Sequence, residues 1–165
     1  MKNYNAKTGG YTLVEMLFYL SIFAIFSVVL INVLIVMTRS FRETAVFADL
    51  VKGSAIMERM AREVSQSPGI VSISSTDLKL YVGDLPTANN TIEFLLSGSD
   101  VVLEEDDVAV GNLNSPNVSV SNLLFTEITT TEGKAVKIEY TISSNRDPQA
   151  RVYNFYDTVI LRGIY

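Results

Sequence analysis

The sequence predicts an α+β protein in which one long N-terminal helix packs on an antiparallel β-sheet. The run from Met16 to Met37 contains no charged residue, glycine or proline, and it is as long as the roughly 20 residues that a membrane-spanning helix needs. Apolar residues then recur at helical spacing, without proline, as far as Ser67. From Gly69 onward the pattern changes to short alternating segments separated by turn residues, which is typical of strands.

Residues 1–10 are polar, carry Lys2 and Lys7 but no acid, and end in two glycines, Gly9 and Gly10. We interpret them as a leader peptide. The apolar run that follows is too long for a secretory signal, whose apolar region spans about 7 to 15 residues and precedes a small-residue cleavage site. Here the small residues come before the run. A cut after Gly10 would leave the helix of residues 11–38 on the mature chain.

Glu15 is a carboxylate close to the start of this apolar run. A charge costs on the order of 2.5 to 3.5 kcal/mol at the centre of a membrane helix, and less near its end. A cut after Gly10 would free an amine on Tyr11, one turn away, which could pair with Glu15 in the same chain or in a neighbour. A carboxylate in the first turn also suits the helix dipole. The plainer alternative is that Glu15 lies among the lipid headgroups of a single-span anchor.

Residues 39–67 continue the helix as an amphipathic segment. Its predicted apolar face comprises Phe41, Ala45, Ala48, Val51, Ala55, Ile56, Met60 and Val64. Its predicted polar side comprises Arg42, Glu43, Asp49, Lys52, Glu58, Arg59, Arg62 and Glu63. Gly53 is expected to weaken the helix by roughly 1 kcal/mol relative to alanine. Pro68 and Gly69 end it.

Residues 68–165 form a β-rich globular domain with about six to eight strands and no helix between them. The expected strands are residues 70–74, 78–82, 91–96, 101–105, 108–113, 118–128, 135–143 and 151–162. Short turns between successive strands favour antiparallel pairing. The sheet needs a cover for its apolar face, and the amphipathic half of the helix supplies it.

Composition excludes several functions. The chain has no cysteine and no histidine, so disulfides, thiol chemistry and histidine-based metal sites or general bases are excluded. The net charge of −5 disfavours direct nucleic-acid binding, which needs a basic face. The acidic cluster of residues 104–107 is consecutive and lacks the alternating spacing of a calcium loop, so a solvated hairpin end is favoured over a metal site. We expect no cofactor and no enzymatic activity.

Residues 10–15 read Gly-Tyr-Thr-Leu-Val-Glu and resemble the processing site of type IV pilins and type II secretion pseudopilins, which is glycine, then Phe-Thr-Leu-[Ile/Val]-Glu, then an apolar helix. The resemblance implies a pilin-like fold. It also implies that Gly9, Gly10 and Tyr11 form the cleavage site of a membrane prepilin peptidase, which cuts after Gly10. It also implies N-methylation of Tyr11 and a part for Thr12 and Glu15 in subunit assembly. Tyr11 departs from the usual phenylalanine.

The resemblance further implies the partners and the location. The partners would be other pilin or pseudopilin subunits and an inner-membrane assembly platform. The chain would cross the cytoplasmic membrane once, with its C-terminal domain outside the cytoplasm. Residues 122–126, Asn-Leu-Leu-Phe-Thr, are loosely similar to minor pilins of the PilW and pseudopilin J kind, which implies a minor subunit of a pilus, secretion or DNA-uptake filament. The alternative is a single-span, membrane-anchored β-domain that binds a ligand or partner and is unrelated to filaments.

Overall fold

The computed structural model describes residues 10–83, 90–131 and 133–162. The chain divides into two compact units, one ending at Phe41 and one beginning at Arg42. The helix α1 (Leu13–Gln66) contributes to both units. The strands in the described residues are β1 (Ile70–Ile73), β2 (Asp77–Val82), β3 (Asn90–Ser97), β4 (Asp100–Glu105), β5 (Val108–Asn112), β6 (Val118–Thr130), β7 (Gly133–Ser144) and β8 (Val152–Ile160).

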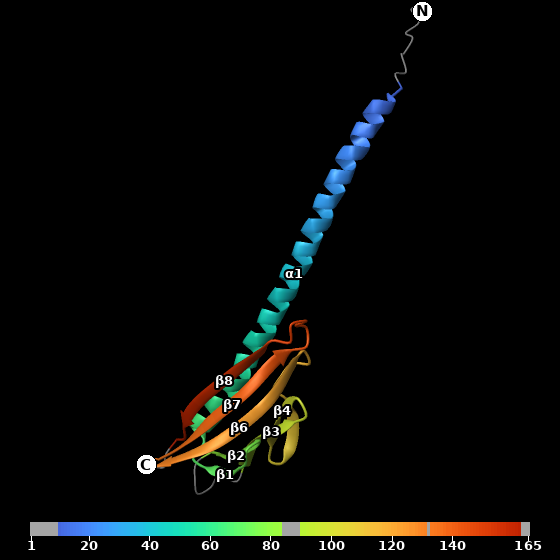
Figure 1. Cartoon of the computed structure of the whole chain (residues 1–165). Coiled ribbons are helices and arrows are strands. Elements are labelled where there is room, and N and C mark those ends of the chain that lie inside the picture. The colour runs from blue at the N-terminus through green and yellow to red at the C-terminus, as the bar shows by residue number, and fades with distance from the viewer. Residues whose placement is uncertain (1–9, 84–89, 132, 163–165) are drawn as a thin grey trace, which may run out of the picture. The chain divides into compact units, whose positions relative to one another are not determined.

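The predicted α+β class is confirmed, because a long N-terminal helix is followed by antiparallel strands that pack on it. The prediction of a single sheet is wrong. The strands form a five-stranded sheet in the order β1-β2-β3-β4-β5 and a three-stranded sheet in the order β6-β7-β8 (Figure 1). The break follows β5, because β6 does not pair with it. Instead, the Val120 amide donates to the carbonyl of Ser99 in the β3–β4 turn, at 2.9 Å.

The second half of α1, within the unit that begins at Arg42, packs along the three-stranded sheet (Figure 1). Its buried positions follow a spacing of three and four residues: Val46, Asp49, Gly53, Ile56, Met57, Met60 and Val64. Residues from both sheets complete one hydrophobic core with this stripe, among them Leu80, Phe94, Phe125, Ile138 and Tyr140. The helix therefore supplies the cover that the sheets need.

The buried face of α1 differs from the predicted one. Ile56, Met60 and Val64 are buried as expected, but Phe41 is 63% exposed and Val51 is 54% exposed. Ala48 and Ala55 are also exposed. The stripe is rotated because it meets β7 through polar contacts that a hydrophobicity pattern does not reveal.

Asp49 shows this rotation most clearly. It was predicted on the polar side of the helix, yet only 1% of its surface is exposed. The Ser144 hydroxyl, at the end of β7, donates to its Oδ2 at 2.7 Å. A buried carboxylate is tolerated when it accepts such a hydrogen bond. Asp49 is therefore a contact between helix and sheet.

Gly53 lies where α1 and β7 approach each other closely, and is not simply a weak position in the helix. The Tyr140 hydroxyl donates to the Gly53 carbonyl at 2.8 Å. A Cβ at Gly53 would overlap the Cδ1 atom of Ile142, while it would lie 3.5 Å and 3.7 Å from that residue's Cγ1 and Cγ2. Any side chain at this position would require the end of the Ile142 side chain to move.

We expect Gly53→Ala to lower the free energy of unfolding by up to about 2 kcal/mol. Alanine gains about 1 kcal/mol of helix propensity, but crowding a packed core costs about 1 to 3 kcal/mol. In an Ile142→Val background, which removes Cδ1, the same substitution should become neutral or stabilising. Urea unfolding of the four variants in detergent, followed by circular dichroism, measures this. Equal effects of Gly53→Ala in both backgrounds would contradict the close approach.

A charged network joins α1 to the loop between β7 and β8. The Asp147 carboxylate accepts from the Arg151 Nε at 2.6 Å and from the backbone amides of Gln149 and Arg151 at 3.0 and 3.1 Å. The Arg151 guanidinium also pairs with Glu43 of α1 at 2.9 Å. The hydrogen bond from Arg151, with the two amides, lowers the pKa of Asp147 from 3.8 to about 2.

This network predicts a loss of stability in acid. Because the pKa of Asp147 is lower in the folded chain than in the unfolded chain, its ionised form stabilises the fold above pH 3.8, and this contribution is lost as the pH falls through about 2. The melting temperature should therefore fall between these pH values, and Asp147→Asn should reduce that fall while lowering stability at pH 7. Calorimetry at pH 7, 4 and 2 is the measurement. If the melting temperature of Asp147→Asn depended on pH as in the wild type, the ion pair between Asp147 and Arg151 would make no contribution to stability.

Candidate functional site

The predicted processing and assembly residues lie at the start of α1. Gly9 lies outside the described residues. Gly10 and Tyr11 are exposed and precede the helix, and 73% of the Tyr11 surface is accessible. The Thr12 hydroxyl accepts a hydrogen bond from the Glu15 amide at 3.3 Å, and the Thr12 carbonyl accepts the first helical bond from Met16. Thr12 is thus the N-cap residue.

The order Thr12-Leu13-Val14-Glu15 also matches a capping box, in which threonine caps the helix and glutamate follows at its third position. This pattern was not among the predicted features, although the spacing of Thr12 and Glu15 indicates it. The cap fixes where the helix begins. It therefore also fixes the distance between the Gly10–Tyr11 bond and the first helical turn.

Glu15 has aromatic neighbours. The Tyr19 hydroxyl donates to its Oε1 in a long hydrogen bond of 3.5 Å. The rings of Tyr11 and Tyr19 meet edge to face, with centroids 6.3 Å apart and an angle of 84° between their planes. The structure therefore brings together two of the predicted site residues, Tyr11 and Glu15, around Tyr19, which the sequence analysis did not single out.

The apolar run beyond Tyr19 is exposed throughout the first unit. The large apolar side chains between Met16 and Met37 each expose between 45% and 68% of their surface. Three hydroxyl groups on α1 are satisfied locally: Ser21, Ser27 and Thr38 donate at 2.8 Å to the carbonyls of Leu17, Phe23 and Leu34. Such internal bonding suits a helix that has no water around it.

Among the described residues, α1 is the one helix that is long and apolar enough to cross a membrane. Its apolar window contributes nothing to the core of the chain. A surface of this kind in water would be an unusually large apolar patch. The predicted transmembrane helix near the N-terminus is supported to this extent.

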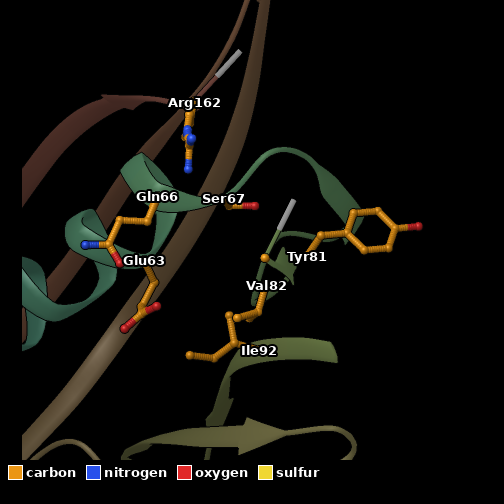
Figure 2. A pocket seen from close by; sticks show the side chains of 8 residues that line it. Glu63, Gln66, Ser67, Tyr81, Val82, Ile92 and Arg162 are labelled. Atoms are coloured by element: carbon orange, nitrogen blue, oxygen red, sulfur yellow. The ribbon is translucent and has the colours of Figure 1, made fainter. Parts of the chain in front are cut away.

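A separate cavity of about 450 Å³ lies in the unit that begins at Arg42 (Figure 2). The end of α1, strands β2 and β3 and the segment after β8 contribute its lining: Glu63, Gln66, Ser67, Tyr81, Val82, Gly83, Ile92 and Arg162. Val82 and Ile92 lie together on one wall, and the Tyr81 ring points away from them (Figure 2). The cavity is bordered by both polar and apolar groups.

The polar side of this cavity is held in place by local bonds. The Glu63 carboxylate pairs with Arg59 at 2.9 Å, one turn earlier in α1. The Ser67 hydroxyl donates to the Gly69 carbonyl and accepts from the Gly69 amide. The Arg162 amide donates to the Ser67 carbonyl at 3.1 Å. The Glu63 carboxylate and the apolar side chains of Val82 and Ile92 thus line the same cavity.

The acidic cluster of residues 104–107 forms the hairpin end that was expected. Asp106 and Asp107 have φ values of 51° and 64°, as the two central residues of a type I′ turn require. Asp106 accepts from the Thr91 amide at 2.7 Å. Asp107 pairs with Lys79 and, together with Glu93, raises the pKa of that ammonium group. In the described part of the chain, no group of three acidic side chains is placed to hold a metal ion.

Comparisons with protein-family models, with curated proteins and with solved structures find no match for this chain. The site must therefore be interpreted from its own residues. Tyr19 was not predicted as a site residue, although residues four positions apart on a helix are neighbours and Tyr19 lies four positions after Glu15. The cavity was not predicted either, and its lining comes from segments far apart in the sequence.

Proposed function

We propose that the chain is a prepilin-like minor subunit of a type IV pilus or of a related type II secretion or DNA-uptake filament. In this proposal it is processed after Gly10, N-methylated on Tyr11 and assembled through α1. The partners are a prepilin peptidase, other pilin or pseudopilin subunits and an inner-membrane assembly platform. The domain that follows the span lies outside the cytoplasm. No catalysis by the chain itself is involved.

One observation carries the proposal. The Gly-Tyr-Thr-Leu-Val-Glu sequence stands immediately before an unbroken, exposed apolar helix. The Gly10–Tyr11 bond lies outside the helix, ahead of the Thr12 cap. A peptidase needs an accessible backbone at the bond that it cuts, and Gly10 and Tyr11 are both exposed. A cut there removes Lys2 and Lys7 and keeps the whole apolar helix.

The mechanism follows from charge and burial. In the membrane, the apolar part of α1 is surrounded by lipid. Cleavage creates an amine on Tyr11, four residues before Glu15, and opposite charges attract strongly where water is excluded. When helices from several subunits gather, the amine of one subunit can pair with Glu15 of its neighbour. This pairing favours one axial register between subunits.

The mass of the purified chain tests the proposal. With an active prepilin peptidase in the same host, we expect a mass that lacks residues 1–10, and a further shift of one methyl group. Gly10→Val, which adds a branched side chain next to the bond, should remain at full length. Asn5→Ala, a control within the leader, should be processed normally. A wild-type chain that keeps residues 1–10 would contradict the proposal.

The alternative, a single-span anchor with a binding domain, has one observation in its favour. The cavity beside Glu63, Val82 and Ile92 is large enough for a small molecule. In that case Glu15 needs only its place at the headgroup level, and the capping box accounts for its position in the first turn. Loss of the Glu15 charge would then leave partner binding unchanged.

A further inference from the structure

Tyr11, Glu15 and Tyr19 are spaced by four residues. On a helix this spacing places side chains in one stripe. Two contacts join these residues. The Tyr19 hydroxyl donates to Oε1 of Glu15 at 3.5 Å, and the rings of Tyr11 and Tyr19 meet edge to face. Tyr11 lies before the Thr12 cap, so its ring folds back over two turns of helix to reach Tyr19.

The exposure of Glu15 reflects these contacts. Between residues 10 and 44, Glu15 and Ser27 are the described residues that are partly buried, and the others are exposed. The Tyr19 hydroxyl contacts Glu15 directly. Such a contact matters for a carboxylate near hydrocarbon, because a charge there needs hydrogen-bond donors to replace water.

The hydroxyl groups of Thr12 and Ser21 make other hydrogen bonds and do not donate to the Glu15 carboxylate. Thr12 uses its oxygen to accept from the Glu15 amide, and Ser21 donates to the Leu17 carbonyl. Among the described side chains, Tyr19 is the one that donates to the carboxylate in these contacts. Because Tyr19 contacts Oε1, the second oxygen of the carboxylate can receive another donor. An amine is such a donor.

We propose that Tyr19 is a positioning residue for Glu15. The Tyr19 hydroxyl holds the Glu15 carboxylate on the side of the helix that faces Tyr11, and the Tyr19 ring holds the Tyr11 ring in place. Glu15 therefore keeps one hydrogen-bond donor while the subunit is in the membrane. Its second oxygen, Oε2, stays available to the amine of another subunit. This inference rests on the proposed function, since it assigns Tyr19 a part in the same assembly site. Tyr19 acts through Glu15 and contacts no substrate.

Carbon-13 NMR of the full chain in lipid nanodiscs tests the contact directly. The side-chain carboxyl resonance of Glu15 is identified by its loss in Glu15→Gln. We expect Tyr19→Phe, which removes only the hydroxyl, to shift this resonance. Phe18→Leu, which changes a neighbouring exposed aromatic residue, should leave it in place. An unchanged resonance in Tyr19→Phe would overturn the inference and leave the proposed function untouched.

Incorporation into filaments tests the role in assembly. In a host with the filament system, Tyr19→Phe should be processed normally but incorporated about threefold to tenfold less, as expected for the loss of one hydrogen bond. In a Glu15→Gln background, Tyr19→Phe should have a smaller effect, because the charge that it positions is absent. Equal incorporation of Tyr19→Phe and wild type would overturn the inference. Wild-type chains that retain residues 1–10 would instead overturn the proposed function.

Discussion

Replacing Glu15 with Gln is expected to reduce incorporation into filaments by about tenfold or more, with processing after Gly10 unchanged. Glutamine keeps the length of the side chain and remains compatible with a capping box. It can also still accept from Tyr19. Only the charge is lost, and with it the proposed attraction to the amine of a neighbouring subunit. A tenfold effect corresponds to about 1.4 kcal/mol, which is modest for an ion pair shielded from water.

The measurement is the ratio of subunit in sheared filaments to subunit in membranes, by quantitative immunoblot. Ser21→Ala is a suitable control, because Ser21 lies on the same helix and bonds only to its own backbone. Normal incorporation of Glu15→Gln would contradict the ion pair between subunits, whereas absence of the wild-type chain from sheared filaments would favour the single-span anchor. A processing defect in the same variant would place Glu15 in peptidase recognition instead.

Met60→Ala is expected to lower the free energy of unfolding by about 2 to 5 kcal/mol, the usual cost of truncating a buried methionine. Met60 is fully buried in the core shared by α1 and both sheets. Alanine is the best helix former, so the helix itself would not be weakened. The whole effect therefore reports on packing between the second half of α1 and the strands.

Val51→Ala is the matched control. Val51 lies on the same helix but is 54% exposed, so its truncation should change stability by less than about 0.5 kcal/mol. Urea unfolding in detergent can be followed by tyrosine fluorescence, because the chain has eight tyrosines and no tryptophan. A larger loss in Val51→Ala than in Met60→Ala would contradict the observed packing of the helix on the strands.

The elements of the fold were largely predictable. The expected helix from about Thr12 to Ser67 corresponds to Leu13–Gln66, because proline and glycine after Ser67 stop it and no stronger signal interrupts it. The alternation of Val136, Ile138, Tyr140 and Ile142 identifies β7, and these four side chains are buried. Local patterns of this kind depend on a few neighbouring residues, so the sequence reveals them.

The pairing of distant elements was not predictable. Asp49 is buried because Ser144, 95 positions later, donates to it. Gly53 is buried where Ile142 and Tyr140 approach it from β7. The contact between the two sheets includes the bond from the Val120 amide to the Ser99 carbonyl, 21 positions earlier. None of these partners is visible in a window of neighbouring residues.

The candidate site shows the same contrast. The local pattern is enough to single out Gly10 and Glu15 as candidate site residues. The contacts of Tyr19 could be recognised only from the structure. In the sequence, a tyrosine whose hydroxyl donates a hydrogen bond looks the same as a tyrosine whose ring faces lipid. The cavity beside Val82 and Ile92 is lined by residues from four separate segments, so no single stretch of the sequence predicts it.

The hydroxyls of Ser21, Ser27 and Thr38 donate to carbonyls of their own helix. A helix with such internal partners needs no solvent or neighbour to satisfy those groups. If α1 leaves lipid for a bundle of other helices, these three side chains keep the same bonds in both surroundings. The equilibrium between the two states would then depend on shape fit between apolar side chains and on the one acidic group near the helix start.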